Sequence, residues 1–164
     1  METVKIETAE LWCAKYMQVA ESTGVFKPQE LAVLRELAIE YHRMPDVNYF
    51  VFEEYNEAGL AGFAIFGRTP LTLDTWDLYW LVVHRDCQGK GIGKNLIRRI
   101  EHFIALSHAR ALLRVETSGR KEYAHARNLY VKMGFTQACS IPNFYDAGDD
   151  LMIYYKELYG GMHE

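Results

Sequence analysis

The sequence has 164 residues, of which 49% are hydrophobic and 13% aromatic, so it is long enough to build one domain with a substantial core. Its formal net charge of -4 argues against a nucleic acid as the main partner, because phosphate binding needs a basic excess or a basic stripe. No apolar run approaches the roughly 20 residues of a membrane span, so we expect no membrane association. The widely spaced Cys13, Cys87 and Cys139 indicate neither a disulfide framework nor a metal site and favour a cytoplasmic location.

The first third of the chain predicts a short strand, two amphipathic helices and a hairpin. Apolar residues recur at helical spacing in two segments, and the second starts with a proline, which is tolerated in a first helical turn. Two aromatic and apolar runs then follow, separated by a short turn that contains glycine. In chain order, the predicted elements span Val4–Ile6, Glu10–Glu21, Pro28–Met44, Tyr49–Tyr55 and Leu60–Phe66.

Thr75–Val83 is the strongest predicted strand, and its nearly continuous apolar second half suggests a central strand buried on both faces. Two more helices and three more strands follow it. They are predicted at Leu96–Ile104, Ala111–Thr117, Ala124–Met133, Phe135–Ile141 and Leu151–Leu158, with Gly134 suited to cap the second of these helices. The order of elements predicts a mixed α and β fold with a mostly antiparallel sheet. Without a repeat or a linker, residues 1–164 are expected to form a single domain.

A glycine-rich segment connects the predicted central strand directly to a helix, and it is here named the glycine loop. Its residues are Gln88, Gly89, Lys90, Gly91, Ile92, Gly93 and Lys94. Backbone amides at a helix N-terminus point outward at the positive end of the helix dipole, where anions bind. The glycines remove side chains that would keep a diphosphate from the backbone, and the lysines add charge. The alternative is that the glycines only form a strand-to-helix turn.

Two familiar nucleotide-binding motifs do not fit the spacing of this loop. A Walker A motif would need Gly and then Ser or Thr where the chain has Gln88 and Asn95. The dinucleotide fingerprint GxGxxG, begun at either of the first two glycines, would need Gly at Lys94 or Leu96. Nucleoside triphosphates and NAD are therefore poor candidates for the bound diphosphate.

The chain resembles the GNAT superfamily of N-acetyltransferases in two motifs. The family's cofactor motif is Gln or Arg, two residues, Gly, one residue, then Gly or Ala after an apolar strand, and it is matched here by Gln88, Gly91 and Gly93 after Leu81–Val83. A helix-to-strand motif follows downstream, with Ala126, Arg127, Leu129, Tyr130, Gly134 and Phe135 as the matching residues. The element order is similar along nearly the whole chain, and the tail is similar to that of many small bacterial members.

The resemblance implies a GNAT α/β (α+β) fold, with a mixed, mostly antiparallel sheet of about six to seven strands, splayed in the centre and flanked by about four helices. The splay would separate Thr75–Val83 from Ala111–Thr117, and the pantetheine arm of acetyl-CoA would enter there. The backbone of Leu81, Val82 and Val83 would then bind pantetheine. The amides of Gly89, Lys90, Gly91, Ile92, Gly93 and Lys94 would hold the diphosphate, with Gln88 at the entrance. Tyr123 departs from the family pattern, because several members carry Asn there.

Acetyl transfer from a thioester to an amine needs a neutral amine and a proton for the departing thiolate. An alkylamine is mostly protonated at neutral pH, so a carboxylate is the natural base. Asp77 aligns with a position where some GNAT members place a catalytic carboxylate, and Glu116 ends the facing strand. The alternatives are a solvent-facing strand residue for Asp77, and a strand-end charge or an ammonium-binding group for Glu116.

Tyr130 occupies the family's position for the acid that protonates the CoA thiolate. A phenol can give its proton to a thiolate at a matched site, whereas the alternative is a packed helix aromatic with a polar partner for its hydroxyl. Aromatic and acidic residues near the C-terminus would suit an amine substrate or only shape a loop before the last strand. These residues are Phe144, Tyr145, Asp146, Asp149 and Asp150.

The leading hypothesis is an acetyl-CoA-dependent N-acetyltransferase that acts by direct transfer in a ternary complex and needs no metal. Its acceptor would be a primary amine of a small molecule, an amino acid or a peptide, which agrees with the acidic net charge. One alternative is an acetyl-CoA-binding sensor without turnover. Another is a tRNA-directed acetyltransferase toxin, which should carry a basic face that this composition does not indicate. Dimers are common among similar proteins, so a homodimer is one possibility.

Overall fold

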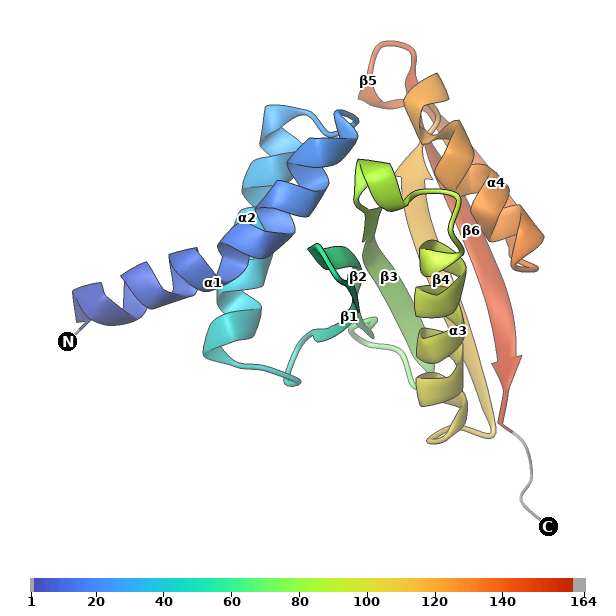
Figure 1. Ribbon diagram of the computed structural model, residues 1–164. Helices are drawn as coiled ribbons and strands as arrows, with labels where there is room; N and C mark the ends of the chain where they lie inside the picture. Colours follow the sequence, from blue (N-terminus) through green and yellow to red (C-terminus); the bar gives the residue numbers. More distant parts are fainter. Residues whose placement is uncertain (1, 161–164) are drawn as a thin grey trace. The chain divides into compact units, whose positions relative to one another are not determined.

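The computed structural model describes residues 2–160. Figure 1 shows its elements, which in chain order are α1 (Glu2–Thr23), α2 (Pro28–Arg43), β1 (Phe50–Asn56), β2 (Gly59–Arg68), β3 (Thr75–Val83), α3 (Ile92–Ala105), β4 (Arg110–Ser118), α4 (Ala124–Lys132), β5 (Thr136–Asp146) and β6 (Asp149–Tyr159). Short 3-10 turns lie at Arg85–Cys87 and Lys121–Tyr123. Across these described residues there are four α-helices and one six-stranded sheet in the order β1-β2-β3-β4-β6-β5. The predicted fold class is confirmed.

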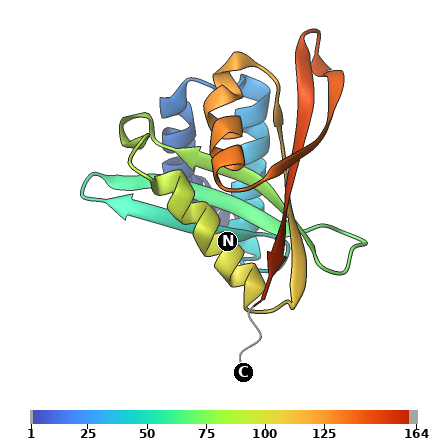
Figure 2. The same ribbon diagram turned by 90° about the vertical axis from the view of Figure 1, so that its right-hand side faces the viewer.

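The sheet is mixed because α3 carries the chain from β3 to a parallel neighbour. The parallel pairing of β3 with β4 runs from Thr75 opposite Leu112 to Leu78 opposite Val115. β6 then pairs antiparallel with both β4 and β5, and β5 and β6 form the long hairpin that ends the chain (Figure 2). A parting of β3 and β4 beyond Leu78, which the family resemblance implies, stays a prediction.

Residue contacts divide the chain into two compact units. The first contains the residues up to Ile65 together with Trp80–Leu96, and the second contains Phe66–Tyr79 together with the residues from Ile97 onward. β3 and α3 each contribute to both units, so the boundary does not fall in a linker. The expectation of a single domain over residues 1–164 stays a prediction.

The core of the first unit lies between α1, α2 and the strands. Its buried members are Cys13, Tyr16, Val19, Ala20, Leu34, Ala38, Phe63, Ile65 and Val82. In β2, Gly62 allows a close approach, because a Cβ there would lie 2.9 Å from both the Val82 carbonyl oxygen and Ile92 Cγ2. β2 therefore packs directly against the end of β3 and the start of α3.

The second unit packs α3 and α4 against one face of the sheet. The apolar stripe predicted on α3 is confirmed, since Ile97, Ile100 and Ile104 are fully buried. Lys156 of β6 donates hydrogen bonds at 2.7 Å to Glu101 Oε1 of α3 and at 2.7 Å to the Met133 carbonyl at the end of α4. This lysine satisfies a terminal helix carbonyl and ties both helices to the same strand.

Three predictions about local structure are wrong. Val4–Ile6 is not a strand but part of α1. A helix satisfies its backbone hydrogen bonds within its own segment, whereas a three-residue strand would need a partner strand. Phe144–Asp146 is not a loop, because β5 continues to Asp146. The second half of β3 is not buried on both faces: Tyr79 is 38% exposed, and the most buried stretch is Trp76–Leu78.

Candidate active site

The glycine loop needs glycine at two positions for backbone reasons. Gly89 has φ 76° and Gly91 has φ 84°, values in the left-handed region that side chains with a Cβ rarely adopt. A Cβ built on either residue would meet no atom within 4 Å. The backbone of the loop is therefore both unusual in conformation and open to a close approach from outside.

The first hydrogen bond of α3 leaves a set of backbone amides without helical acceptors. The Asn95 amide donates to the Gly91 carbonyl at 2.9 Å, which makes Gly91 the N-cap residue that directly precedes α3. The amides of Ile92, Gly93 and Lys94 precede this bond and have no acceptor inside the helix. They lie at the positive end of the helix dipole, and the adjacent Lys94 side chain is exposed. This arrangement suits an anion.

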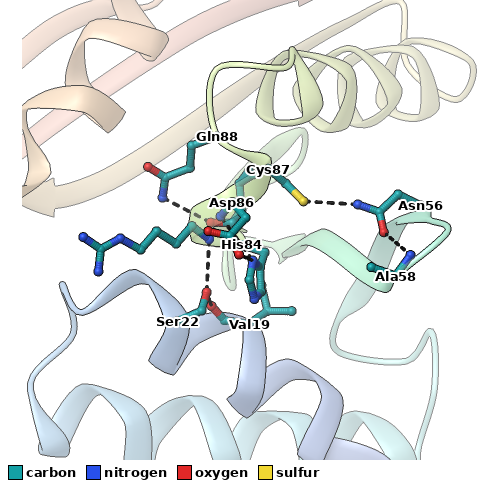
Figure 3. Close-up of polar contacts among 10 residues, drawn as sticks. Val19, Ser22, Asn56, Ala58, His84, Asp86, Cys87 and Gln88 are labelled. Atoms are coloured by element: carbon teal, nitrogen blue, oxygen red, sulfur yellow. Dashed lines mark hydrogen bonds and ion pairs between the residues drawn. The ribbon is translucent and has the colours of Figure 1, made fainter.

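Contacts with two other elements hold the loop's approach in place (Figure 3). The Arg85 amide donates to Ser22 Oγ of α1 at 3.1 Å, and Asn56 Nδ2 of β1 donates to Cys87 Sγ at 3.2 Å. Gln88 Nε2 donates to the Val83 carbonyl at 3.2 Å, across the turn that follows β3. Cys87 is buried and serves as an anchor of the loop. The side chain predicted at the loop entrance is thus tied to the strand end.

The two predicted carboxylates are joined by an arginine. Asp77 is 7% exposed, and its Oδ1 accepts a hydrogen bond from Arg114 Nε at 2.6 Å while its Oδ2 accepts one from Thr69 Oγ1 at 2.7 Å. The Arg114 Nη1 atom lies 3.3 Å from Glu116 Oε1, and the Glu116 side chain is 40% exposed. The interpretation of Asp77 as a solvent-facing residue is therefore wrong. Of the two carboxylates, Glu116 is the one that solvent reaches.

Strand register places these three side chains on one face of the sheet. Asp77 and Arg114 are directly paired across β3 and β4, and Glu116 lies two residues further along β4. Because successive strand residues point to opposite faces, Val115 and its partner Tyr154 on β6 face the other way. The polar side chains thus share the face opposite to the one that packs against the helices.

Tyr130 lies on that opposite, helix-covered face. It is 5% exposed, and its ring centroid lies 5.7 Å from that of Phe135 and 6.0 Å from that of Tyr154. Burial raises the pKa of the Tyr130 phenol well above its ordinary value. The phenol therefore stays protonated near neutral pH, which is the form that can donate a proton.

The approach to α4 is ordered by a second polar cluster. Arg127 Nη1 donates to the carbonyls of Ser118 at 2.6 Å and Arg120 at 2.8 Å, and Ser118 Oγ donates to the buried Asp149. Tyr123, which departs from the family pattern, precedes α4, and the Arg120 guanidinium lies 5.2 Å from its ring centroid. These hydrogen bonds of Arg127 connect the helix that carries Tyr130 to the end of β4 and the turn that follows it.

Comparisons with known proteins show the family of this chain. Residues 45–137, more than half of the chain, match the model of the "Acetyltransferase (GNAT) domain". A crystal structure from Desulfovibrio desulfuricans, of a protein assigned to the GNAT family, is 39% identical and has a TM-score of 0.77, covering 86% of this chain and 88% of that one. The chain belongs to the GNAT family of acetyltransferases.

Two further solved structures have the same fold. The ribosomal-protein-S18-alanine N-acetyltransferase from Escherichia coli is 25% identical with a TM-score of 0.60, covering 77% of this chain and 79% of that one. An aminoglycoside 6'-N-acetyltransferase complexed with coenzyme A is 17% identical with a TM-score of 0.67, covering 85% and 88%. At that identity the second likeness concerns the fold alone. A search of curated proteins finds no match.

The GNAT domain match includes all the predicted catalytic and cofactor-binding residues, but the structure groups them unevenly. It joins Asp77 to Glu116 through Arg114, and Gln88 to Val83, whereas Tyr130 packs on the other side of the sheet from the carboxylates. Arg114 was not singled out from the sequence. Its two-residue spacing from Glu116 was the available signal, but the pairing with Asp77 depends on strand register.

The buried Tyr130 phenol predicts a loss of stability at alkaline pH. Because folding raises its pKa, the contribution is fully present below about pH 10, the ordinary tyrosine value, and is lost as pH rises towards the folded pKa. Between about pH 10 and the folded pKa, the wild type should lose about 1.4 kcal/mol of unfolding free energy per pH unit more than Tyr130→Phe. Urea unfolding near neutral and at alkaline pH measures this difference. The control is Tyr145→Phe, which removes a half-exposed phenol. If the difference in unfolding free energy between the wild type and Tyr130→Phe changes with pH no more than it does for this control, the prediction is contradicted.

Proposed function

We propose that this protein is an acetyl-CoA-dependent N-acetyltransferase that transfers the acetyl group directly to a primary amine. The observation behind the proposal is the glycine loop. Its backbone is open to a close approach at Gly89 and Gly91, and the first amides of α3, which have no acceptor inside the helix, follow directly. A diphosphate supplies the anionic oxygens that such amides bind. Membership of the GNAT family and the coenzyme A complex of one structure with this fold support acetyl-CoA as the donor.

The residues proposed to hold acetyl-CoA lie along the end of β3 and the loop that follows. The amides of the glycine loop would bind the diphosphate, with Lys90 and Lys94 contributing charge. The backbone of Leu81, Val82 and Val83 would bind pantetheine. Gln88 Nε2 already donates a hydrogen bond to the Val83 carbonyl. Pantetheine would therefore bind to the second lone pair of that oxygen and to the other backbone groups of Leu81–Val83.

Glu116 is proposed as the general base rather than Asp77. Both Asp77 oxygens are held by Arg114 and Thr69 within the protein, whereas the Glu116 carboxylate is exposed at 40%. Glu116 would take the proton that the ammonium must lose, after which the amine nitrogen forms a bond to the acetyl carbon, the carbon–sulfur bond breaks and the nitrogen gives up its second proton to solvent. Asp77 would contribute through Arg114.

Tyr130 is proposed to give its proton to the departing thiolate. Burial raises the pKa of Tyr130 and so keeps the phenol in its protonated form, the form that can donate to the thiolate. Within the second unit, Tyr130 and Glu116 lie on opposite faces of the sheet, so the proposed acid and the proposed base would be supplied from different faces.

The acceptor is proposed to be an amine of a small molecule, an amino acid or a peptide. Two structures with this fold are named for an alanine of a ribosomal protein and for the 6' position of an aminoglycoside, which supports an amine acceptor without choosing between the two classes. A cytoplasmic location agrees with Cys13, Cys87 and Cys139, which are free thiols in the described chain.

Acetyl-CoA should stabilise the folded protein, because a ligand that binds only the native state raises its unfolding free energy. A concentration of about 100 times the Kd gives about 2.7 kcal/mol, which thermal unfolding detects as a higher Tm. ATP and NAD should give no comparable rise. Lys94→Gln should reduce the rise, and Lys132→Gln, an exposed lysine of α4, is the matched control. An unchanged Tm at saturating acetyl-CoA would rule out the cofactor assignment.

The two carboxylates should respond differently to neutral substitution. With an amine panel and thiol detection of released CoA, Glu116→Gln should lower kcat by about 100-fold, a typical loss for a general base, with little change in Tm. Asp77→Asn should lower Tm, because it leaves the Arg114 charge without its buried partner, and should cost less in kcat. The reverse order of kcat losses would assign the base to Asp77. If the wild type binds acetyl-CoA but releases no CoA with any amine, the protein is a sensor.

Tyr130→Phe should separate catalysis from cofactor binding. Loss of the hydroxyl removes the proposed acid and keeps the ring contacts with Phe135 and Tyr154, so kcat should fall by about 100-fold. The rise in Tm with acetyl-CoA should stay close to that of the wild type. Turnover equal to the wild type would remove the acid role from this residue.

A further inference from the structure

One line of polar contacts runs from the loop before β3 to the exposed carboxylate of β4. Thr69 donates to Asp77 Oδ2 at 2.7 Å, Arg114 Nε donates to Asp77 Oδ1 at 2.6 Å, and Arg114 Nη1 lies 3.3 Å from Glu116 Oε1. The buried end of this line is fixed on both oxygens of the Asp77 carboxylate. The exposed end is the carboxylate proposed as the base.

The chemistry of arginine suits a link of this kind. A guanidinium is planar, always charged and presents its N–H groups in a fixed fork, so fixing Nε also fixes the direction of Nη1. The hydrogen bond that Arg114 donates to Asp77 is the largest influence that raises the pKa of Arg114 above its ordinary value. A lysine at this position would offer one ammonium, which cannot be held by the buried carboxylate and directed by it in the same way.

The charged and titratable groups around Glu116 come from three strands of the second unit. Arg114 precedes it by two residues on β4, and Asp77 and Tyr79 act on that guanidinium from β3. On the other side of β4, the strand β6 places Ile153 opposite Glu116 and the titratable Tyr155 opposite Arg114. Among these groups the guanidinium is the cation, and it lies 3.3 Å from the Glu116 carboxylate.

We propose that Arg114 is a positioning residue for Glu116: Asp77, whose other oxygen is held by Thr69, fixes the guanidinium, and the guanidinium holds the Glu116 carboxylate in one orientation. This inference rests on the proposed function of Glu116 as the general base. Arg114 itself acts through the carboxylate and needs no contact with the acetyl group or the amine.

The test compares Arg114→Gln with Arg110→Gln. Arg110 lies on the same strand and pairs with Glu157 of β6 at 2.9 Å, so the control removes an arginine ion pair of similar geometry. Arg114→Gln should lower kcat about tenfold and leave the KM for acetyl-CoA within about twofold, whereas the control should change neither. Adding Glu116→Gln to Arg114→Gln should cost no more than Glu116→Gln alone, because the two residues act as one unit.

A second pair of variants keeps the test independent of folding defects. Arg114→Gln leaves Asp77 buried without its cation, whereas Asp77→Asn/Arg114→Gln removes both charges together and lets two amides pair. The double variant should fold and should show the same drop in kcat. Arg114→Lys should recover less than half of the lost activity, since charge alone does not restore the fork. Turnover like that of Arg110→Gln, or a loss additive with Glu116→Gln, would overturn the proposal.

A spectrum reads the contact without any turnover. The side-chain carboxyl carbon of Glu116, assigned by its absence in Glu116→Gln, is followed by NMR at one neutral pH. Its chemical shift should change in Arg114→Gln, because the carboxylate loses its contact with the guanidinium, and should not change in Arg110→Gln. An unchanged chemical shift overturns the inference even if acetyl-CoA binds and is turned over. A changed chemical shift supports the contact even if the acetyl-CoA experiment fails.

Discussion

The hydrogen bond from the Asn95 amide to the Gly91 carbonyl decides where α3 begins, and the proposed chemistry depends on that point. The amides that precede it have no acceptor in the helix, so they are available to an anion at the positive end of the helix dipole. Gly89 and Gly91 allow the chain to reach this geometry with its backbone uncovered. The contacts of Arg85 with Ser22 and of Asn56 with Cys87 then hold the loop in one arrangement before any ligand binds.

The buried Asp77 carboxylate shows how a structural charge can serve a neighbouring site. An isolated carboxylate at this depth would be strongly unfavourable, but Arg114 and Thr69 satisfy both oxygens. The same guanidinium extends towards the exposed Glu116. The ion pair of Asp77 with Arg114 therefore has two effects inside the second unit. It compensates the buried Asp77 charge, and it places a cation next to the solvent-exposed Glu116 carboxylate.

The position of Tyr130 follows from packing against Phe135 and Tyr154 under α4. The register of β4 with β6 puts these contacts on the face opposite to Glu116. The register between the strands of the second unit therefore decides on which face each proposed catalytic side chain lies.

The sequence by itself determined the glycine loop, the elements on either side of it and the family, because these depend on local spacing within a few residues or turns. It also predicted most strand and helix positions, but not the continuation of α1 through Val4–Ile6 or of β5 through Phe144, where tertiary or long-range pairing outweighs short patterns. Only the tertiary structure decided that Asp77 is buried against Arg114 and that Tyr130 lies on the opposite face from Glu116. Both depend on strand register, which brings together residues far apart in the chain and leaves no local signal.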